Sequence, residues 1–156
     1  MTLKTPERFC ARIRSVGGTP LYRNDFQVLA DLRVEEAASL IASGHGQGAY
    51  YLCGYAVECA LKACIAKKTK AYQFPPKMDE IRNIYSHRLN ELLRVSGLDD
   101  ELETETKTNK ALEVNWNAVR DWTEESRYRT SGLNGRDLYA AVTGADGVLP
   151  WLKLRW

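Results

Sequence analysis

The sequence predicts an all-α fold, an up-and-down bundle of four to five helices, and three observations lead to this class. Apolar residues recur at spacings of three and four over long segments. Glycines and prolines separate these segments, and none of them has the alternating pattern of a convincing strand. At 156 residues, the chain is long enough for one domain with a core that needs neither disulfides nor metal. We expect an N-terminal arm over residues 1–22 and one helical domain over residues 23–156.

The first predicted helix begins at "RNDF", where Asn24 or Asp25 can cap it, and it runs to about Ser43. Its apolar residues form one stripe along the helix. The glycines of "SGHGQG" then end the helix and reverse the chain.

The second predicted helix, "AYYLCGYAVECALKACIAKK" (49–68), carries the strongest signal in the sequence. Small residues dominate its apolar face, so a neighbouring helix can approach it closely. Glu58 and Lys62 stand one turn apart in this apolar stretch, in the order that favours an ion pair.

Three further segments complete the predicted bundle. The prolines of "AYQFPPK" break the helical pattern and introduce a loop of about fifteen residues. A short helix follows in "SHRLNELLRVSGL", capped by Ser86, and another begins at the acidic "DDELETETK" and continues through Trp122. After the turn-rich "EESRYRTSGLNG", the last helix starts near Arg136 and is interrupted near Gly144 or Gly147.

Composition narrows the class of protein and argues against several kinds of site. The net charge of +2 is too small to indicate a polyanion-binding protein, so any such site requires local clustering of basic residues. We expect a cytoplasmic protein, because the sequence has neither a signal peptide pattern nor an apolar run of membrane-helix length. We expect no cofactor and no metal, because no CxxC pair is present and neither histidine stands at ligand spacing from a cysteine. The cysteines are expected to be buried free thiols: Cys10, Cys53, Cys59 and Cys64.

The segment "RNIYSH" (82–87) combines groups that could act on a phosphodiester. Arg82 can hold a phosphate, His87 can transfer a proton near neutral pH, and Asn83 can orient either group. On a regular helix, five positions correspond to about 140° of rotation, so Arg82 and His87 converge only if the chain bends before Ser86. The alternative is that His87 starts a helix and bonds to backbone or a carboxylate, while Arg82 is solvated.

A second cluster lies in "SRYRTSG", where basic residues flank an aromatic ring. Arg127, Tyr128 and Arg129, with Arg120 about two turns earlier, resemble the arginine and aromatic content of single-stranded RNA sites. The alternative is a helix end at which basic residues oppose the last carbonyls and Tyr128 packs on the bundle.

The segment "ASGHGQGAYYLCGYAVECALKACIAKK", followed by "YSHRLNELL" and "SRY", resembles the HEPN domain family over about residues 25–150. The resemblance implies a helical bundle that forms a homodimer with a cleft between the protomers. Many members are metal-independent endoribonucleases of toxin–antitoxin pairs, often beside a nucleotidyltransferase, or of phage-defence systems. Others have lost catalysis and bind nucleotides or partner proteins.

The family's catalytic signature is an arginine, usually followed by a polar residue, with a histidine after four to six further residues. Arg82, Asn83 and His87 match that wording. In ribonuclease members, however, the signature lies in the last helices, whereas here it stands in the middle of the chain. A related subgroup has a structural "H-x-L-x-x-L" helix start at this place, which "HRLNELL" also matches. The sequence therefore leaves two hypotheses, an RNA-cleaving dimer and a non-catalytic module that binds a nucleotide or a partner protein.

Overall fold

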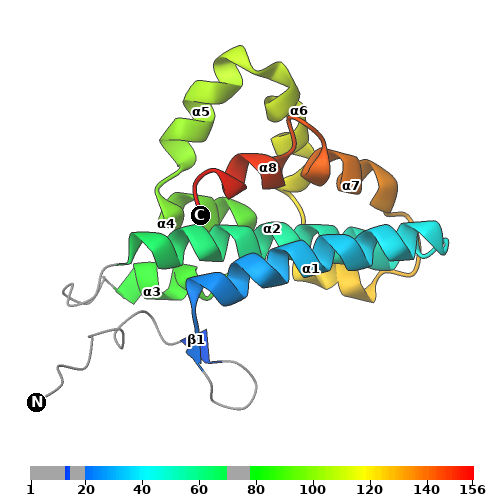
Figure 1. The fold of residues 1–156 in the computed structure, drawn as a ribbon, viewed down its shortest axis with the longest axis horizontal. Coiled ribbons are helices and arrows are strands. Elements are labelled where there is room, and N and C mark those ends of the chain that lie inside the picture. Colours follow the sequence, from blue (N-terminus) through cyan, green and yellow to red (C-terminus); the bar gives the residue numbers. More distant parts are fainter. Residues whose placement is uncertain (1–12, 15–19, 70–77) are drawn as a thin grey trace, which may run out of the picture.

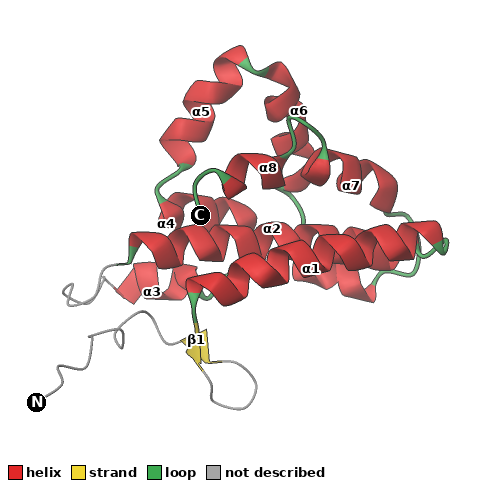
Figure 2. Cartoon of the chain, viewed as in Figure 1, coloured by secondary structure: helices red, strands yellow, loops and turns green. Residues whose placement is uncertain are grey.

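The computed structural model of the chain describes residues 13–14, 20–69 and 78–156, and these form a bundle of helices (Figures 1 and 2). The predicted all-α class is confirmed. The helices are α1 (Arg23–Ala42), α2 (Gly46–Lys68), α3 (Met78–Ile84), α4 (Leu89–Ser96), α5 (Asp99–Thr108), α6 (Lys110–Val119), α7 (Gly135–Thr143) and α8 (Val148–Lys153), with a 3₁₀ helix, η1 (Glu124–Tyr128).

Helix α2 is the centre of the bundle, and α1, α4, α7, α8 and η1 pack against it. Figure 1 shows α1 running alongside α2 in the opposite direction, with α7 and α8 against the same pair. Small buried side chains at the contact, such as Ala30 and Ala37 of α1 and Ala56 and Ala60 of α2, allow this close approach. The predicted bounds of both helices hold to within a few residues.

The pairing of Glu58 with Lys62 is confirmed, since Lys62 Nζ lies 2.7 Å from Glu58 Oε1. Three of the four cysteines are buried free thiols, as expected: Cys53, Cys59 and Cys64. Cys10 lies outside the described residues.

The region before α4 differs from the expectation of one long loop. Helix α3 occupies residues 78–84, and the proline-containing segment 70–77 lies outside the described residues. The predicted cap was wrong, because Arg88 is the N-cap residue of α4. Ser86 Oγ instead accepts a hydrogen bond from the Arg88 backbone N–H at 3.0 Å and donates one to Glu91 Oε2 at 2.5 Å. This arrangement fixes the turn that presents His87.

The helix expected from the acidic segment through Trp122 is divided into α5 and α6. Asn109 separates them and caps α6, because its Oδ1 accepts a hydrogen bond from Leu112 N–H at 3.0 Å. A side-chain acceptor of this kind competes with the backbone ladder and favours a helix start. The chain therefore bends at Asn109, and Figure 1 shows α5 and α6 as an arch above the rest of the bundle.

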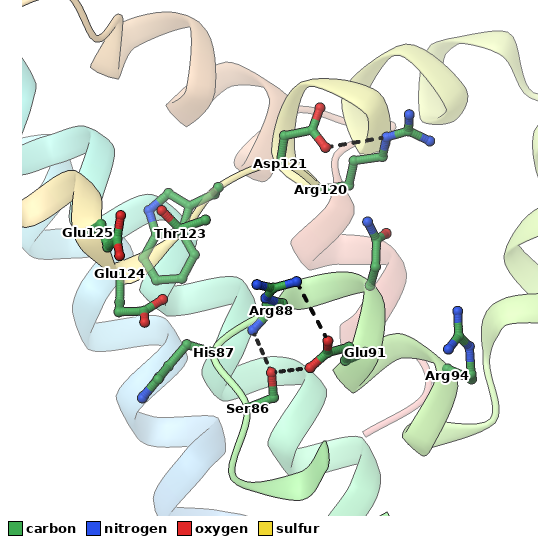
Figure 3. A pocket seen from close by; sticks show the side chains of 12 residues that line it. Ser86, His87, Arg88, Glu91, Arg94, Arg120, Asp121, Thr123, Glu124 and Glu125 are labelled. Atoms are coloured by element: carbon green, nitrogen blue, oxygen red, sulfur yellow. Dashed lines mark hydrogen bonds and ion pairs between the residues drawn. The ribbon is translucent and has the colours of Figure 1, made fainter. Parts of the chain in front are cut away.

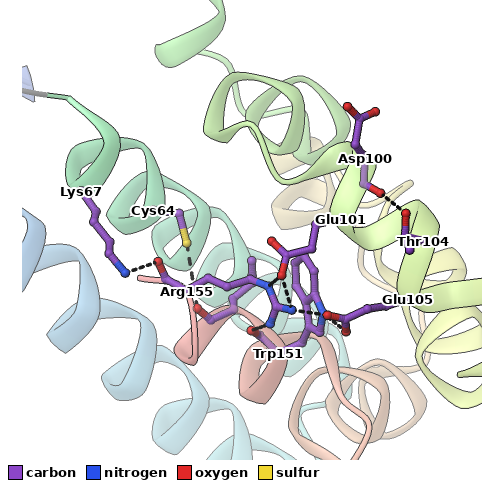
Figure 4. A network of polar contacts seen from close by, with 9 residues as sticks. Cys64, Lys67, Asp100, Glu101, Thr104, Glu105, Trp151 and Arg155 are labelled. Carbon is purple, nitrogen blue, oxygen red and sulfur yellow. Dashed lines mark hydrogen bonds and ion pairs between the residues drawn. The ribbon is translucent and has the colours of Figure 1, made fainter.

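Residues of α8 and the C-terminal end hold α5 in place (Figure 4). Arg155 donates to Glu101 Oε1 from Nε at 3.0 Å and from Nη2 at 2.8 Å, and it also pairs with Glu105. Its guanidinium lies 3.8 Å from the centre of the Trp151 ring, whose Nε1–H donates to Glu105 Oε2 at 2.6 Å. Planar guanidinium geometry serves the stacking and the forked hydrogen bonds together.

The C-terminal part of the chain follows the prediction, whereas the N-terminal part contains a short strand pair. The predicted interruption of the last helix near Gly144 or Gly147 is confirmed, because α7 ends at Thr143 and α8 begins at Val148. Of the expected arm, residues 1–12 and 15–19 lie outside the described residues. Ile13–Arg14 (β1) and Pro20–Leu21 (β2) form a short antiparallel pair, which the sequence pattern did not predict.

Candidate functional site

A buried carboxylate on α2 is the starting point of the site. The Glu58 side chain is only 2% exposed, and its neighbours along α2 are mostly buried apolar residues. Two donors reach it: Lys62 Nζ at 2.7 Å and His87 Nδ1 at 3.0 Å from Oε1 and 3.1 Å from Oε2. Burying a carboxylate is costly unless it is paired and hydrogen-bonded, and these two partners offset that cost.

His87 lies in the turn between α3 and α4, and its side chain is 49% exposed. Because a carboxylate only accepts hydrogen bonds, the contact with Glu58 places the proton of a neutral imidazole on Nδ1. Nε2 then carries a lone pair, and no described residue forms a hydrogen bond with it. Glu58 thus orients the ring and leaves its other nitrogen available as a base.

His87 lines a cavity of about 590 Å³ between the start of α4 and the segment after α6 (Figure 3). The lining is mainly polar and contains three arginines and four carboxylates. These are Arg88, Arg94 and Arg120, with Glu91, Asp121, Glu124 and Glu125. Figure 3 shows Ser86, Arg88 and Glu91 joined in one group, with the His87 side chain pointing away from it.

The arginines of the cavity are only loosely paired. Arg88 Nη1 lies 4.0 Å from Glu91 Oε1, and Arg120 Nε lies 3.9 Å from Asp121 Oδ1. Arg88, Arg120 and Asp121 are exposed and Glu91 is partly exposed, so each pair contributes at most about 1 kcal/mol to stability. The guanidinium groups can therefore turn toward an anionic ligand at little energetic cost.

The structure does not bring the residues of the "RNIYSH" segment together in this cavity. Arg82 and Asn83 belong to the last turn of α3, and neither lines the cavity. The chain leaves the helix after Ile84, so His87 is three residues beyond its end. The chain does bend before Ser86, as convergence would require, but the bend directs His87 to Glu58 and leaves Arg82 outside the cavity. His87 thus bonds to a carboxylate and Arg82 is exposed, as the alternative interpretation of this segment expected.

The second cluster divides between two places. Arg120 lines the cavity beside His87, whereas Arg127 and Tyr128 lie on η1 and Arg129 follows its end. The Arg127 guanidinium lies 4.8 Å from the centre of the Tyr128 ring, and Tyr128 is 72% exposed. Hydrogen bonds to Tyr128 and Tyr51 raise the pKa of Arg127. Tyr128 therefore does not pack into the bundle as the alternative required.

Sequence reasoning identified His87 but not the part that Glu58 plays in holding it. The available signal was a carboxylate in the middle of an apolar helix, because such a residue requires partners that local pairing with Lys62 alone only partly supplies. Within the described residues, no group of three or more histidine, cysteine or acidic side chains is arranged to hold a metal ion.

None of the helices in the described part of the chain is long and apolar enough to cross a membrane. Comparison with known protein families, curated proteins and solved structures finds no match to this chain.

Proposed function

We propose that the protein is a HEPN-like endoribonuclease of the kind found in toxin–antitoxin or phage-defence systems, in which His87 is the acid–base group. The observation that carries the proposal is the contact of His87 Nδ1 with a buried carboxylate at 3.0 Å, on a ring that is half exposed at a cavity. An imidazole held in this way has one fixed nitrogen and one free nitrogen, which is the arrangement that acid–base catalysis uses.

The chemistry needs no metal, because the RNA supplies its own nucleophile. His87 Nε2 takes the proton of a 2′-hydroxyl, the 2′-oxygen forms a bond to the adjacent phosphorus, and the bond from phosphorus to the 5′-oxygen breaks. The leaving 5′-oxygen receives a proton from an imidazolium, either His87 itself or its copy in a second protomer. The products are a 2′,3′-cyclic phosphate and a 5′-hydroxyl. Glu58 stabilises the imidazolium formed in the first step.

A cation must also stabilise the charge that develops on the phosphate. The sequence assigned this role to Arg82, but the arginines that share the cavity with His87 are Arg88, Arg94 and Arg120. Of these, we assign the phosphate contact to Arg88 and Arg120, whose ion pairs are loose. Arg82 and Asn83 remain predicted site residues, but they do not line the cavity.

One observation favours a second function. Four carboxylates line the same cavity as the three arginines, and this mixture is unlike a site built to hold a polyanion. A non-catalytic module would use the cavity to bind a nucleotide through a few arginines, or a partner protein such as a nucleotidyltransferase through both signs of charge.

The two functions are separated by incubating the purified protein with single-stranded RNA of mixed sequence in EDTA. We expect cleavage, and we expect His87→Ala to lower its rate by about 10²- to 10⁴-fold. The matched control is His45→Ala, because the other histidine is exposed at the start of α2, away from the cavity. Glu58→Gln should lower the rate and shift its pH profile while the far-ultraviolet circular dichroism stays unchanged. Cleavage that survives His87→Ala would refute the assignment, and absence of cleavage by the wild type would favour the binding module.

A further inference from the structure

Two partly buried tyrosines of α2 and one exposed tyrosine of η1 lie near the Glu58–His87 contact. Tyr51 and Tyr55 lie one turn apart on α2, and their rings are stacked with centroids 6.1 Å apart and planes at 14°. Tyr128 lies on η1, which packs against α2, and Arg127 beside it has its pKa raised by interaction with both Tyr128 and Tyr51. We call Tyr51, Tyr55 and Tyr128 the tyrosine strip.

Arginines from two other elements flank the strip. Arg127 lies over the Tyr128 ring and is exposed. Arg33 lies on α1, the helix that packs alongside α2, and its charge acts to lower the pKa of Tyr55. Its Nη1 pairs with Glu36 at 2.7 Å, while its buried Nε has no hydrogen-bond partner among the described residues. Arginines close to aromatic rings are the combination that binds the backbone and bases of single strands.

The strip leads directly to the proposed acid–base group. Tyr55 is three residues before Glu58 on α2, so the two side chains lie on one face of the helix. Glu58 in turn binds His87. Burial, with a contribution from the Glu58 charge, raises the pKa of Tyr55 to about 12. The Tyr55 hydroxyl is therefore uncharged near neutral pH and does not repel a phosphate.

We propose that the tyrosine strip binds the unstacked bases of single-stranded RNA, with Arg127 and Arg33 on its phosphates, and leads the strand to His87. The proposal deepens the proposed function, on which it rests, by naming the substrate class as single-stranded. Bases in a duplex are stacked on one another and cannot place their faces on tyrosine rings, whereas splayed single-stranded bases can.

Binding is measured by fluorescence anisotropy with the His87→Ala protein, so that the RNA stays intact. The probe is a 5′-labelled RNA of mixed sequence, either single-stranded or annealed to its complement. We expect the single strand to bind more tightly. Tyr128→Ala should raise its Kd roughly five- to tenfold, and Tyr55→Leu at least as much. Arg127→Ala should reduce the slope of log K against log salt by about one. The control is Tyr22→Ala, an exposed tyrosine at the start of α1.

Equal affinity for single strand and duplex, or a Tyr128→Ala protein that binds like the wild type, would overturn the proposal, as would the absence of RNA binding. Tyr128 is 72% exposed, so its substitution tests the strip even if Tyr55→Leu fails to fold. The outcome is separable from that of the proposed function. Tight, tyrosine-dependent binding of single strands without cleavage in the wild type would leave the strip in place and remove only the nuclease.

Discussion

Replacing Gly54 with alanine tests the close contact between α2 and Trp122, a residue that lines the cavity. Gly54 is buried in the middle of α2, and the indole of Trp122 lies directly on it. A Cβ added at Gly54 would lie 2.2 Å from two ring atoms of Trp122 and 2.3 Å from a third. Trp122 is 1% exposed, and it also lines the cavity beside His87.

Two effects of opposite sign determine the result. Alanine favours a helix over glycine by about 1 kcal/mol. Against this, the flat ring would have to move by more than an ångström to reach ordinary contact distance, and overpacking of a core costs about 1–3 kcal/mol or more. Three ring atoms clash at once, and Tyr51 lies against the same ring with centroids 6.0 Å apart. The cost of overpacking therefore exceeds the gain in helix propensity, and we expect a net loss of about 2 kcal/mol.

The free energy of unfolding is measured by urea denaturation followed by circular dichroism, and the tryptophan emission reports the displacement of the indole. The control is Gly46→Ala, at the start of α2, because the atom nearest to its added Cβ is 4.0 Å away. That variant should be neutral or slightly more stable. A Gly54→Ala protein at least as stable as the wild type would refute the steric argument. The double variant Gly54→Ala, Trp122→Phe should recover part of the loss, because the smaller ring leaves room for the methyl group.

Two other predictions concern stability. Arg155→Lys should lower the free energy of unfolding by about 1–3 kcal/mol although the charge is kept. The reason is that lysine cannot stack on Trp151 and reach Glu101 and Glu105 together. The matched control is Lys107→Arg, at an exposed ion pair, which should have little effect on stability. Burial raises the pKa of Cys59 to about 12 from 9.0 and that of Tyr55 to about 12 from 10.0, so the folded chain keeps protons that the unfolded chain releases. The melting temperature should therefore fall as pH rises above about 9, less steeply in Cys59→Ala, and a flat profile between pH 8 and 11 would contradict this.

The helical class could be predicted because it depends on local pattern, and the divisions between helices could not because they depend on tertiary contacts. The periodicity of α1 and α2 is continuous, and both helices were found within a few residues of their observed bounds. The break at Asn109 has a capping residue but no glycine or proline, so nothing in the pattern required the chain to stop there. Asn109 Nδ2 also donates to Asp146 Oδ1 at 2.9 Å, a contact between residues far apart in the sequence.

The contrast between local pattern and tertiary contacts also explains which residues of the candidate site could be predicted. His87 could be singled out from the sequence, because histidine is the side chain that transfers protons near neutral pH. Arg82, the arginine of the same sequence motif, was assigned by its spacing from His87 along the chain, but it lies on α3 and does not line the cavity. Its actual partner, Glu58, is 29 residues away and becomes adjacent only when α4 packs on α2.

The buried carboxylate is nevertheless recognisable in the sequence, because Glu58 stands in the middle of an apolar helical stretch. An acidic residue in the interior of an apolar helix requires hydrogen-bond donors, and Lys62 uses only one of the lone pairs of Glu58. A second donor must come from elsewhere in the fold, and His87 is the histidine that the bundle brings there. The buried charge of Glu58 is therefore a stronger signal of the site than the spacing of Arg82 and His87. The motif names a histidine, but the buried charge determines which nitrogen of that histidine is bound to the carboxylate.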